Sequence, residues 1–533
     1  MFSRTLLTCA ALLALPLMGQ AQVESEGMSD ITAWGARYLE ASEAEFPTRL
    51  WQGSSDETLL ALMKQVNTTR ITPAERKLLR RAILSPTRRP TGDLADELLA
   101  ERARLMLALG EAEAASELVP RLETEARGID AEALAIDLAL ARGDELTGCR
   151  PTKSAARMPD GMYWMKLRAV CAVLEENYAR AEFAMELASA QGLDDDWFIS
   201  AIFAASGDTP NPPNARFDTG LNIALSAKAD LDQSRITTSS SRPDLAAAAA
   251  QRPGIPPQLA ERFASIAAEV GLLSVEDQRR ILMARMDEAE FTPANAIQAV
   301  IASFRDPLNL PSEQARQLDQ ALRNAASGDL ARITSTSQLL LPELRALPRI
   351  PETAPYALTF AMAALTAGDH ELVQTWLGAT EFEGLQPPDP FAVARLEALD
   401  LISGGDNSRA SQASVQARLI AAAENGEQKS EAAHLLTLWQ GFGLSLGPEA
   451  RAMIGTHGHS GRRLSSGKLT ELEAAAQAGA VGETVLLVLS ATDRDPGTLA
   501  ARDLAELIQA LRRVGAEDIA QDLAIEAANL WVE

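Results

Sequence analysis

A short turn recurs at nearly constant spacing between Leu94 and Gly207. Its positions are Gly110, Gly143, Glu176 and Gly207, which lie 33, 33 and 31 residues apart (143 − 110, 176 − 143 and 207 − 176), and each follows an apolar run with helical spacing. Such a step holds two helices of about 12 to 15 residues with their turns. One helical pair cannot bury its apolar face alone, so neighbouring pairs must stack. The spacing therefore predicts an all-α fold, an α-solenoid of stacked antiparallel helical hairpins.

These turns resemble those of tetratricopeptide-type and Sel1-type repeats. The shared feature is a Gly-Asp/Glu-x-x-x-Ala turn with small residues after it; GEAEAA at Gly110–Ala115 fits it, and ENYARA at Glu176–Ala181 keeps the final alanine. The resemblance implies a right-handed superhelix. The chain is also similar to a group of secreted helical proteins from alphaproteobacteria, a likeness that implies no activity. That likeness rests on Trp51-Gln52-Gly53, the run Arg80–Pro86, the cysteines Cys149 and Cys171, and GLDDDWF at Gly192–Phe198.

Breaks in the pattern divide the chain into four parts. We expect a signal peptide at 1–21, an N-terminal helical-repeat region at 22–207, a middle helical region with proline-rich breaks at 208–350, and a C-terminal helical-repeat region at 351–533. The first predicted helices are Ile31–Ala44, Glu57–Val66 and Pro73–Leu84. Thr72 with Glu75 forms a capping-box pattern around Pro73 at the first helical position. In the last region, two further turns at Gly368 and Gly405 lie 37 residues apart (405 − 368).

The N-terminus has the pattern of a secretory signal peptide. Arg4 precedes a short apolar run at Thr5–Leu17, and Gly19-Gln20-Ala21 places small residues before a cut after Ala21. An uncleaved membrane anchor is the alternative, for which the apolar run is too short. No later run of 18 apolar residues lacks charge. We therefore expect a periplasmic or secreted protein that does not insert into the membrane after signal cleavage.

The formal net charge of −24 disfavours nucleic acid as a partner, because phosphate binding needs a basic surface. One basic cluster stands out after Thr72 and is a candidate for binding an acidic partner; the alternative is the solvated face of a helix. The cluster contains Arg76, Lys77, Arg80, Arg81, Arg88 and Arg89.

Two cysteines, Cys149 and Cys171, remain after removal of the signal peptide. An even number in an exported protein predicts a disulfide. Two free buried thiols are the alternative. A redox-active pair is disfavoured because the chain has no Cys-x-x-Cys motif.

Other candidate sites are weaker. His457 and His459 share the polar stretch Gly455–Gly467, which we expect to be a loop, but an H-x-H pair supplies only two of the four ligands of a structural zinc site. Asp194-Asp195-Asp196 lacks the calcium-loop pattern and is better explained as a helix N-cap before Trp197. No phosphate-binding, dinucleotide-binding, nucleophile-elbow or zinc-protease motif occurs, so we expect no cofactor and no metal.

The leading hypothesis is a non-enzymatic exported scaffold whose helical array binds a protein, a peptide or an envelope component, since repeat arrays present extended concave surfaces. The alternative is a cell-wall (peptidoglycan) enzyme or a regulator of one. In soluble lytic transglycosylases a helical superhelix carries a compact catalytic domain. The stretch after Gly467 looks like further helical hairpins rather than such a domain.

Overall fold

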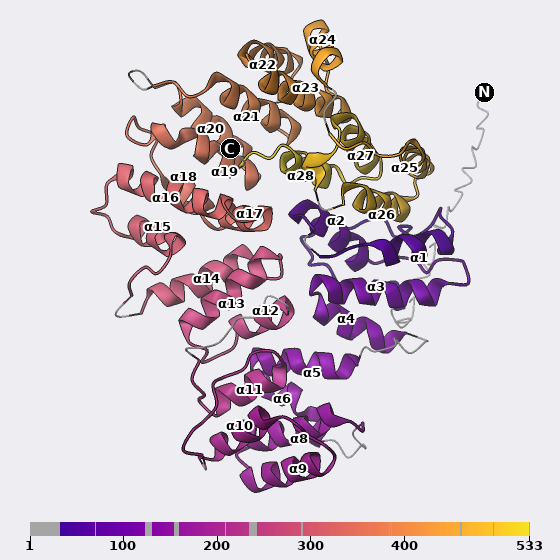
Figure 1. The fold of residues 1–533 in the computed structure, drawn as a ribbon, viewed down its shortest axis with the longest axis vertical. Coiled ribbons are helices and arrows are strands. Elements are labelled where there is room, and N and C mark those ends of the chain that lie inside the picture. Colours follow the sequence, from indigo (N-terminus) through magenta and orange to yellow (C-terminus); the bar gives the residue numbers. More distant parts are fainter. Residues whose placement is uncertain are drawn as a thin grey trace, which may run out of the picture.

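The computed structural model describes residues 32–69, 71–122, 130–153, 159–207, 209–233, 242–288, 291–382, 384, 386–406, 408–458, 461–493 and 495–531. Within these ranges the protein is all-α, with 28 α-helices and three short 3₁₀ helices (Figure 1). No strand occurs among them apart from one isolated bridge between Arg462 and Leu499. The prediction of an all-α fold is confirmed. The predicted signal peptide at 1–21 lies outside the described residues.

The first half of the chain contains α1 (Asp56–Gln65), α2 (Pro73–Leu84), α3 (Ala95–Leu109), α4 (Ala112–Leu118), η1 (Val119–Arg121), α5 (Ala131–Arg142), α6 (Glu145–Gly148), α7 (Arg150–Lys153), α8 (Met162–Leu174), α9 (Tyr178–Ala190), α10 (Asp196–Ser206), α11 (Gly220–Lys228), α12 (Pro243–Ala250) and α13 (Pro257–Glu269). The second half contains α14 (Val275–Met286), α15 (Ala296–Arg305), α16 (Pro311–Ala326), α17 (Leu330–Leu339), α18 (Leu341–Ala346), η2 (Ala354–Tyr356), α19 (Ala357–Thr366), α20 (His370–Ala379), α21 (Pro390–Ile402), α22 (Arg409–Ala422), α23 (Gly426–Gly441), α24 (Pro448–His457), α25 (Ser466–Ala478), α26 (Val481–Thr492), η3 (Pro496–Thr498), α27 (Ala501–Arg513) and α28 (Glu517–Ala527).

Helix α2 begins and ends where the sequence pattern places it. The Thr72 hydroxyl accepts from the backbone N–H of Glu75 at 3.3 Å, and the Glu75 carboxylate accepts from the N–H of Thr72 at 2.8 Å. This capping box satisfies two N–H groups that have no partner within the helix. The N-cap before Trp197 is also present, because the Asp195 carboxylate accepts from the N–H of Phe198 at 3.1 Å.

The recurring turns share one backbone conformation. The four turn positions of the first region have φ between 60° and 88°, and the N–H of the following residue returns to a carbonyl of the last helical turn in three of them. For example, Glu111 donates to Met106 at 2.8 Å and Asn177 donates to Ala172 at 2.9 Å. Glycine adopts this left-handed conformation without a steric penalty. In the last region Gly368 takes the same position, whereas at the next turn the left-handed residue is Gly404 and not Gly405.

Two local predictions were wrong. The described part of the predicted helix Ile31–Ala44 forms turns and not a helix. Its backbone bonds instead to the region of Leu84 and Thr87, through Tyr38 to Leu84 at 3.3 Å and Thr87 to Trp34 at 2.8 Å. These bonds tie the segment to the end of α2, so tertiary contacts override the helical pattern. The predicted loop Gly455–Gly467 is shorter than expected, because α24 continues to His457.

The helices follow a closed course (Figure 1). Helices α1–α4 form one side, α5–α11 the lower end, α12–α21 the other side and α22–α28 the upper end. The chain ends then meet, since α1 packs against α26, and α2 packs against both α26 and α28. We call this contact the closing seam. In a simple repeat array each unit touches only its sequence neighbours, so the contact between the two ends departs from that arrangement.

Buried apolar residues form two clusters. One joins α1–α4 to α14–α28 across the closing seam. The other spans α4–α14 and includes Cys149 and Cys171. The second cluster contains residues on both sides of position 207, so packing is continuous across the division expected there. In the part of the chain with described structure, no helix is both long and apolar enough to cross a membrane.

Candidate functional site

A cavity of about 610 Å³ lies beside the closing seam, where the two sides of the molecule approach each other. Its wall comes from α2, the α13–α14 turn, α17, the α19–α20 turn, the end of α21, and α28. Pockets that hold small ligands typically measure about 300–1,000 Å³. We call this space the central cavity.

The recurring glycine turns help to shape the central cavity. Gly271 between α13 and α14 and Gly368 between α19 and α20 both line it, with φ of 68° and 78°. A left-handed glycine ends a helix abruptly and lets the next helix start within a few residues. The hairpin ends of the second side are therefore directed at α2 and α28.

Complementary charges hold α2 against α28. Lys77 Nζ lies 2.7 Å from Asp522 and 3.2 Å from Asp518. The Arg81 guanidinium makes a two-pronged contact with Asp518, at 2.9 and 2.5 Å. Burial opposes ionisation of Asp518, but the hydrogen bonds and charges of Arg81 and Lys77 prevail and lower its pKa to about 2. Asp518 is therefore a carboxylate at every physiological pH.

Glu526, two turns further along α28, has the opposite protonation state. Its carboxyl accepts from the N–H of Ala74 at 2.7 Å, and its second oxygen, Oε2, has no hydrogen-bond partner within the described structure. The residue is 9 % exposed, and burial raises its pKa to about 8. Near it the Glu75 carboxylate accepts from the Thr492 hydroxyl. At neutral pH Glu526 is thus mainly a protonated acid inside the seam.

His370 lines the central cavity opposite α2 and is paired with a buried aspartate. His370 Nδ1 lies 3.0 Å from a carboxylate oxygen of Asp400, which is 1 % exposed. The other oxygen of Asp400 accepts from the Gln374 amide at 2.6 Å. The hydrogen bond to Asp400 raises the pKa of His370. Since Nδ1 is engaged, Nε2 is the ring atom left for other interactions.

The predicted basic cluster does not form one surface. Arg76 and Arg80 line the central cavity, whereas Arg81 lies within the closing seam. Arg80 pairs with Glu43 and with Glu111. Arg89 pairs with Asp96 at 3.0 Å, and Arg88 is exposed.

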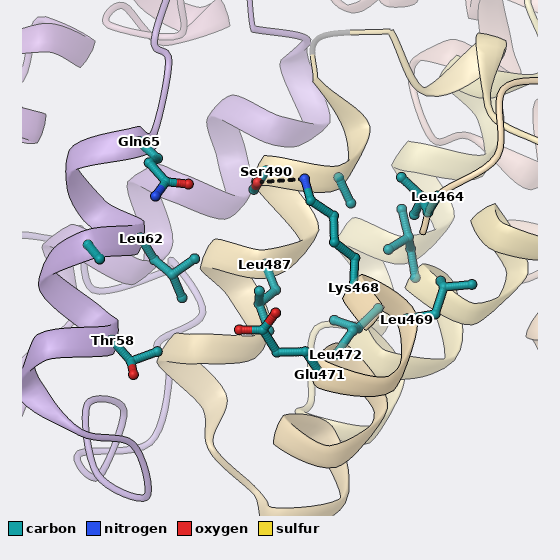
Figure 2. Close-up of a pocket in the computed structure, with 13 residues that line it drawn as sticks. Thr58, Leu62, Gln65, Leu464, Lys468, Leu469, Glu471, Leu472, Leu487 and Ser490 are labelled. Atoms are coloured by element: carbon teal, nitrogen blue, oxygen red, sulfur yellow. Dashed lines mark hydrogen bonds between the residues drawn. The ribbon is translucent and has the colours of Figure 1, made fainter. Parts of the chain in front are cut away.

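A second pocket of about 330 Å³ lies on the outer side of the seam, between α1 and α25–α27 (Figure 2). Leu62 faces Leu487 and Leu472 across it, and the Lys468 ammonium group reaches to 3.5 Å from the Ser490 hydroxyl. The wall is mostly aliphatic, with Lys468 and Glu471 as its charged groups.

The predicted disulfide is present. Cys149 and Cys171 are bonded, with 5.6 Å between their Cα atoms, and link the end of α6 to α8. Of the two candidate histidine ligands, His457 is the last residue of α24 and His459 lies outside the described residues. No group of three or more His, Cys, Asp or Glu side chains gathers at metal-binding distance in the described ranges.

The fold and cavity define the class: an all-helical protein whose many helices are in packed contact, an arrangement compatible with a helical-repeat protein. No protein-family model, curated protein or solved structure matches this chain.

Sequence reasoning missed the acidic half of the site. A signal was present, since Asp518, Asp522 and Glu526 recur every fourth residue and so share one face of α28. Lys77 and Arg81 have the same spacing on α2. The match between an acidic and a basic stripe becomes visible only when the two ends of the chain are compared directly.

Proposed function

We propose that this protein is an exported, non-enzymatic helical-repeat scaffold of the solenoid type that binds a peptide segment of a partner in its central cavity. The observation that carries the proposal is the cavity itself, of about 610 Å³ and lined by polar and charged side chains from helices far apart in the sequence. A peptide offers hydrogen-bonding groups along its whole length, which suits such a wall. The partner is a protein, a free peptide or an envelope component.

Two features support export. The N-terminal pattern is that of a signal peptide, and the Cys149–Cys171 disulfide is typical of proteins from oxidising compartments. The acidic surface, with a net charge of −24, favours a protein or peptide partner over a nucleic acid.

The alternative function, a cell-wall enzyme or a regulator of one, has one observation in its favour. A histidine whose Nδ1 is held by a buried carboxylate, as in the pair of His370 and Asp400, is an arrangement that general bases use. Measuring the release of soluble fragments from purified peptidoglycan tests this alternative. Turnover that is abolished in His370→Asn would replace the scaffold proposal.

The scaffold proposal is tested by affinity capture from envelope extract, with residues 22–533 as bait. Gln338 on α17 is exposed and lines the central cavity, so Gln338→Trp fills part of the cavity without disturbing a buried group. Gln320→Trp on neighbouring α16, a position that does not line the cavity, is the matched control. We expect a partner that the wild type and Gln320→Trp retain and Gln338→Trp loses. Identical captured sets for all three baits would refute binding in the cavity.

A further inference from the structure

The cations of the central cavity differ in whether they are already neutralised. Lys77 and Arg80 pair with carboxylates, as described above. Arg76, one turn before Arg80, forms no ion pair within the described structure, and its one assigned hydrogen bond goes from Nη1 to the carbonyl of Leu109 at 2.9 Å. Burial lowers the pKa of Arg76, and the charge of nearby Glu111 partly offsets that shift. Glu111 itself is already hydrogen-bonded to Arg80. Arg76 thus holds a half-buried positive charge with spare N–H donors.

The acidic side chains of the cavity also divide into those with a charged partner and those without. Asp518 and Asp522 pair with Lys77, Glu43 pairs with Arg80, and Glu526 is mainly neutral. Glu269, the last residue of α13, forms no ion pair within the described structure. Burial and the like charge of Asp329 raise its pKa, while Arg332 opposes the shift. A cation brought next to Glu269 would therefore be attracted by a carboxylate that its surroundings leave under-compensated.

One unpaired cation on α2 and one unpaired anion at the end of α13 thus line the same space. A sphere of about 610 Å³ is roughly 10 Å across. Three extended peptide residues span at most about 10–11 Å. A tripeptide with a free carboxylate and a free ammonium group therefore fits a space of this size, and its two charges are opposite to those of Arg76 and Glu269.

We propose that the central cavity recognises a short zwitterionic peptide, whose carboxylate is held by Arg76 and whose ammonium group is held by Glu269. This proposal rests on the proposed function, because it names the chemistry of the segment that the scaffold takes up. Such a peptide comes either from protein breakdown or from stem peptides cleaved from the glycan strand of peptidoglycan, since that cleavage frees the amino terminus.

The test is isothermal titration of the mature chain with tri-alanine, with its N-acetyl form and with its C-terminal amide. The tripeptide of the peptidoglycan stem, without its attached sugars, is titrated in parallel. Comparing its affinity with that of tri-alanine distinguishes peptidoglycan from protein breakdown as the source. Removing a charge-assisted hydrogen bond from a binding site typically weakens affinity by roughly tenfold or more. We expect Arg76→Gln to weaken binding of the free peptide and of the acetylated peptide, which both have a carboxylate, but not binding of the amide, which has none. We expect Glu269→Gln to weaken binding of the free peptide and of the amide, which both have an ammonium group, but not binding of the acetylated peptide, which has none.

This crossed pattern separates direct binding from a general effect on folding, because misfolding weakens every ligand alike. Equal losses for all three peptides, or no binding of either the tri-alanine or the stem tripeptide, would overturn the assignment. If capture of a partner still depends on Gln338 in that case, the scaffold proposal stands and only the ligand chemistry fails.

Discussion

Replacing Glu526 with glutamine tests whether the closing seam contains a protonated carboxyl group. Glutamine has nearly the same shape and keeps a carbonyl oxygen to accept from the N–H of Ala74, which Glu526 now does at 2.7 Å. It differs in that it cannot ionise. The variant therefore removes the titration of Glu526 while leaving the packing of the seam in place.

The size of the effect follows from the pKa of Glu526, which burial raises to about 8 from an ordinary value of 4.5. The folded state holds this proton more tightly than the unfolded chain does. The stabilising contribution is therefore complete below pH 4.5 and is lost as the pH rises through 8. Between pH 6 and pH 9 the wild type should lose about 2–3 kcal/mol of unfolding free energy from this group. Glu526→Gln should lack this loss, and should thus be more stable than the wild type at pH 9.

The assay is urea unfolding of both proteins at pH 6 and pH 9, followed by tryptophan fluorescence. Other groups with raised pKa values, such as Asp522 and Glu269, titrate in both proteins, so the difference between the two curves isolates Glu526. Hydrogen exchange of the peptide covering 72–84 locates the effect at the start of α2. Parallel pH dependences for the two proteins would refute a buried protonated acid at this position.

Further predictions concern packing and covalent stability. Gly482→Ala places a Cβ about 2.5 Å from the Trp51 ring and 2.8 Å from the Leu50 carbonyl oxygen, so it should destabilise the seam by about 1–3 kcal/mol in urea unfolding. Gly455→Ala, at a helical position in α24 with open space around it, is the matched control and should be neutral or stabilising by up to about 1 kcal/mol. Equal losses of stability in both variants would contradict the packing described at Gly482. Changing Cys149 and Cys171 together to serine opens a loop with a sequence separation of 22 and should cost about 3 kcal/mol, measured as the difference in urea midpoint between the variant and the oxidised wild type. A variant that matches the oxidised wild type would show that the bond adds no stability.

Local features of the fold could be predicted because neighbouring residues determine them. The capping box of Thr72 and Glu75, the N-cap of Asp195 and the left-handed turns at Gly110 and Gly143 each depend on a few consecutive residues. The disulfide could be predicted for a different reason, since only two cysteines follow residue 21.

The closing seam could not be predicted in this way. The bond between Glu526 and Ala74 joins residues 452 positions apart, and the charged stripes of α2 and α28 do not show, each by itself, which helix is its partner. The same holds for the segment after Thr32, where bonds to Leu84 and Thr87 replaced the helix that its apolar spacing favours. Arg76 was recognised as part of a basic cluster, but only the structure shows that its neighbours are already paired.

The central claim is that the two ends of the chain meet in the closing seam, beside the central cavity. Carbodiimide joins an amine to a carboxylate only when the two are in contact, so it reports ion pairs directly. Treatment of a chain of residues 22–533, followed by digestion and mass spectrometry, should yield a cross-link between the peptide of Lys77 and that of Asp518 and Asp522, whose charged atoms lie 3.2 and 2.7 Å from Nζ. The pair of Lys228 and Glu176, at 2.9 Å, is the internal control. A control cross-link without the one from Lys77 would contradict the closed arrangement.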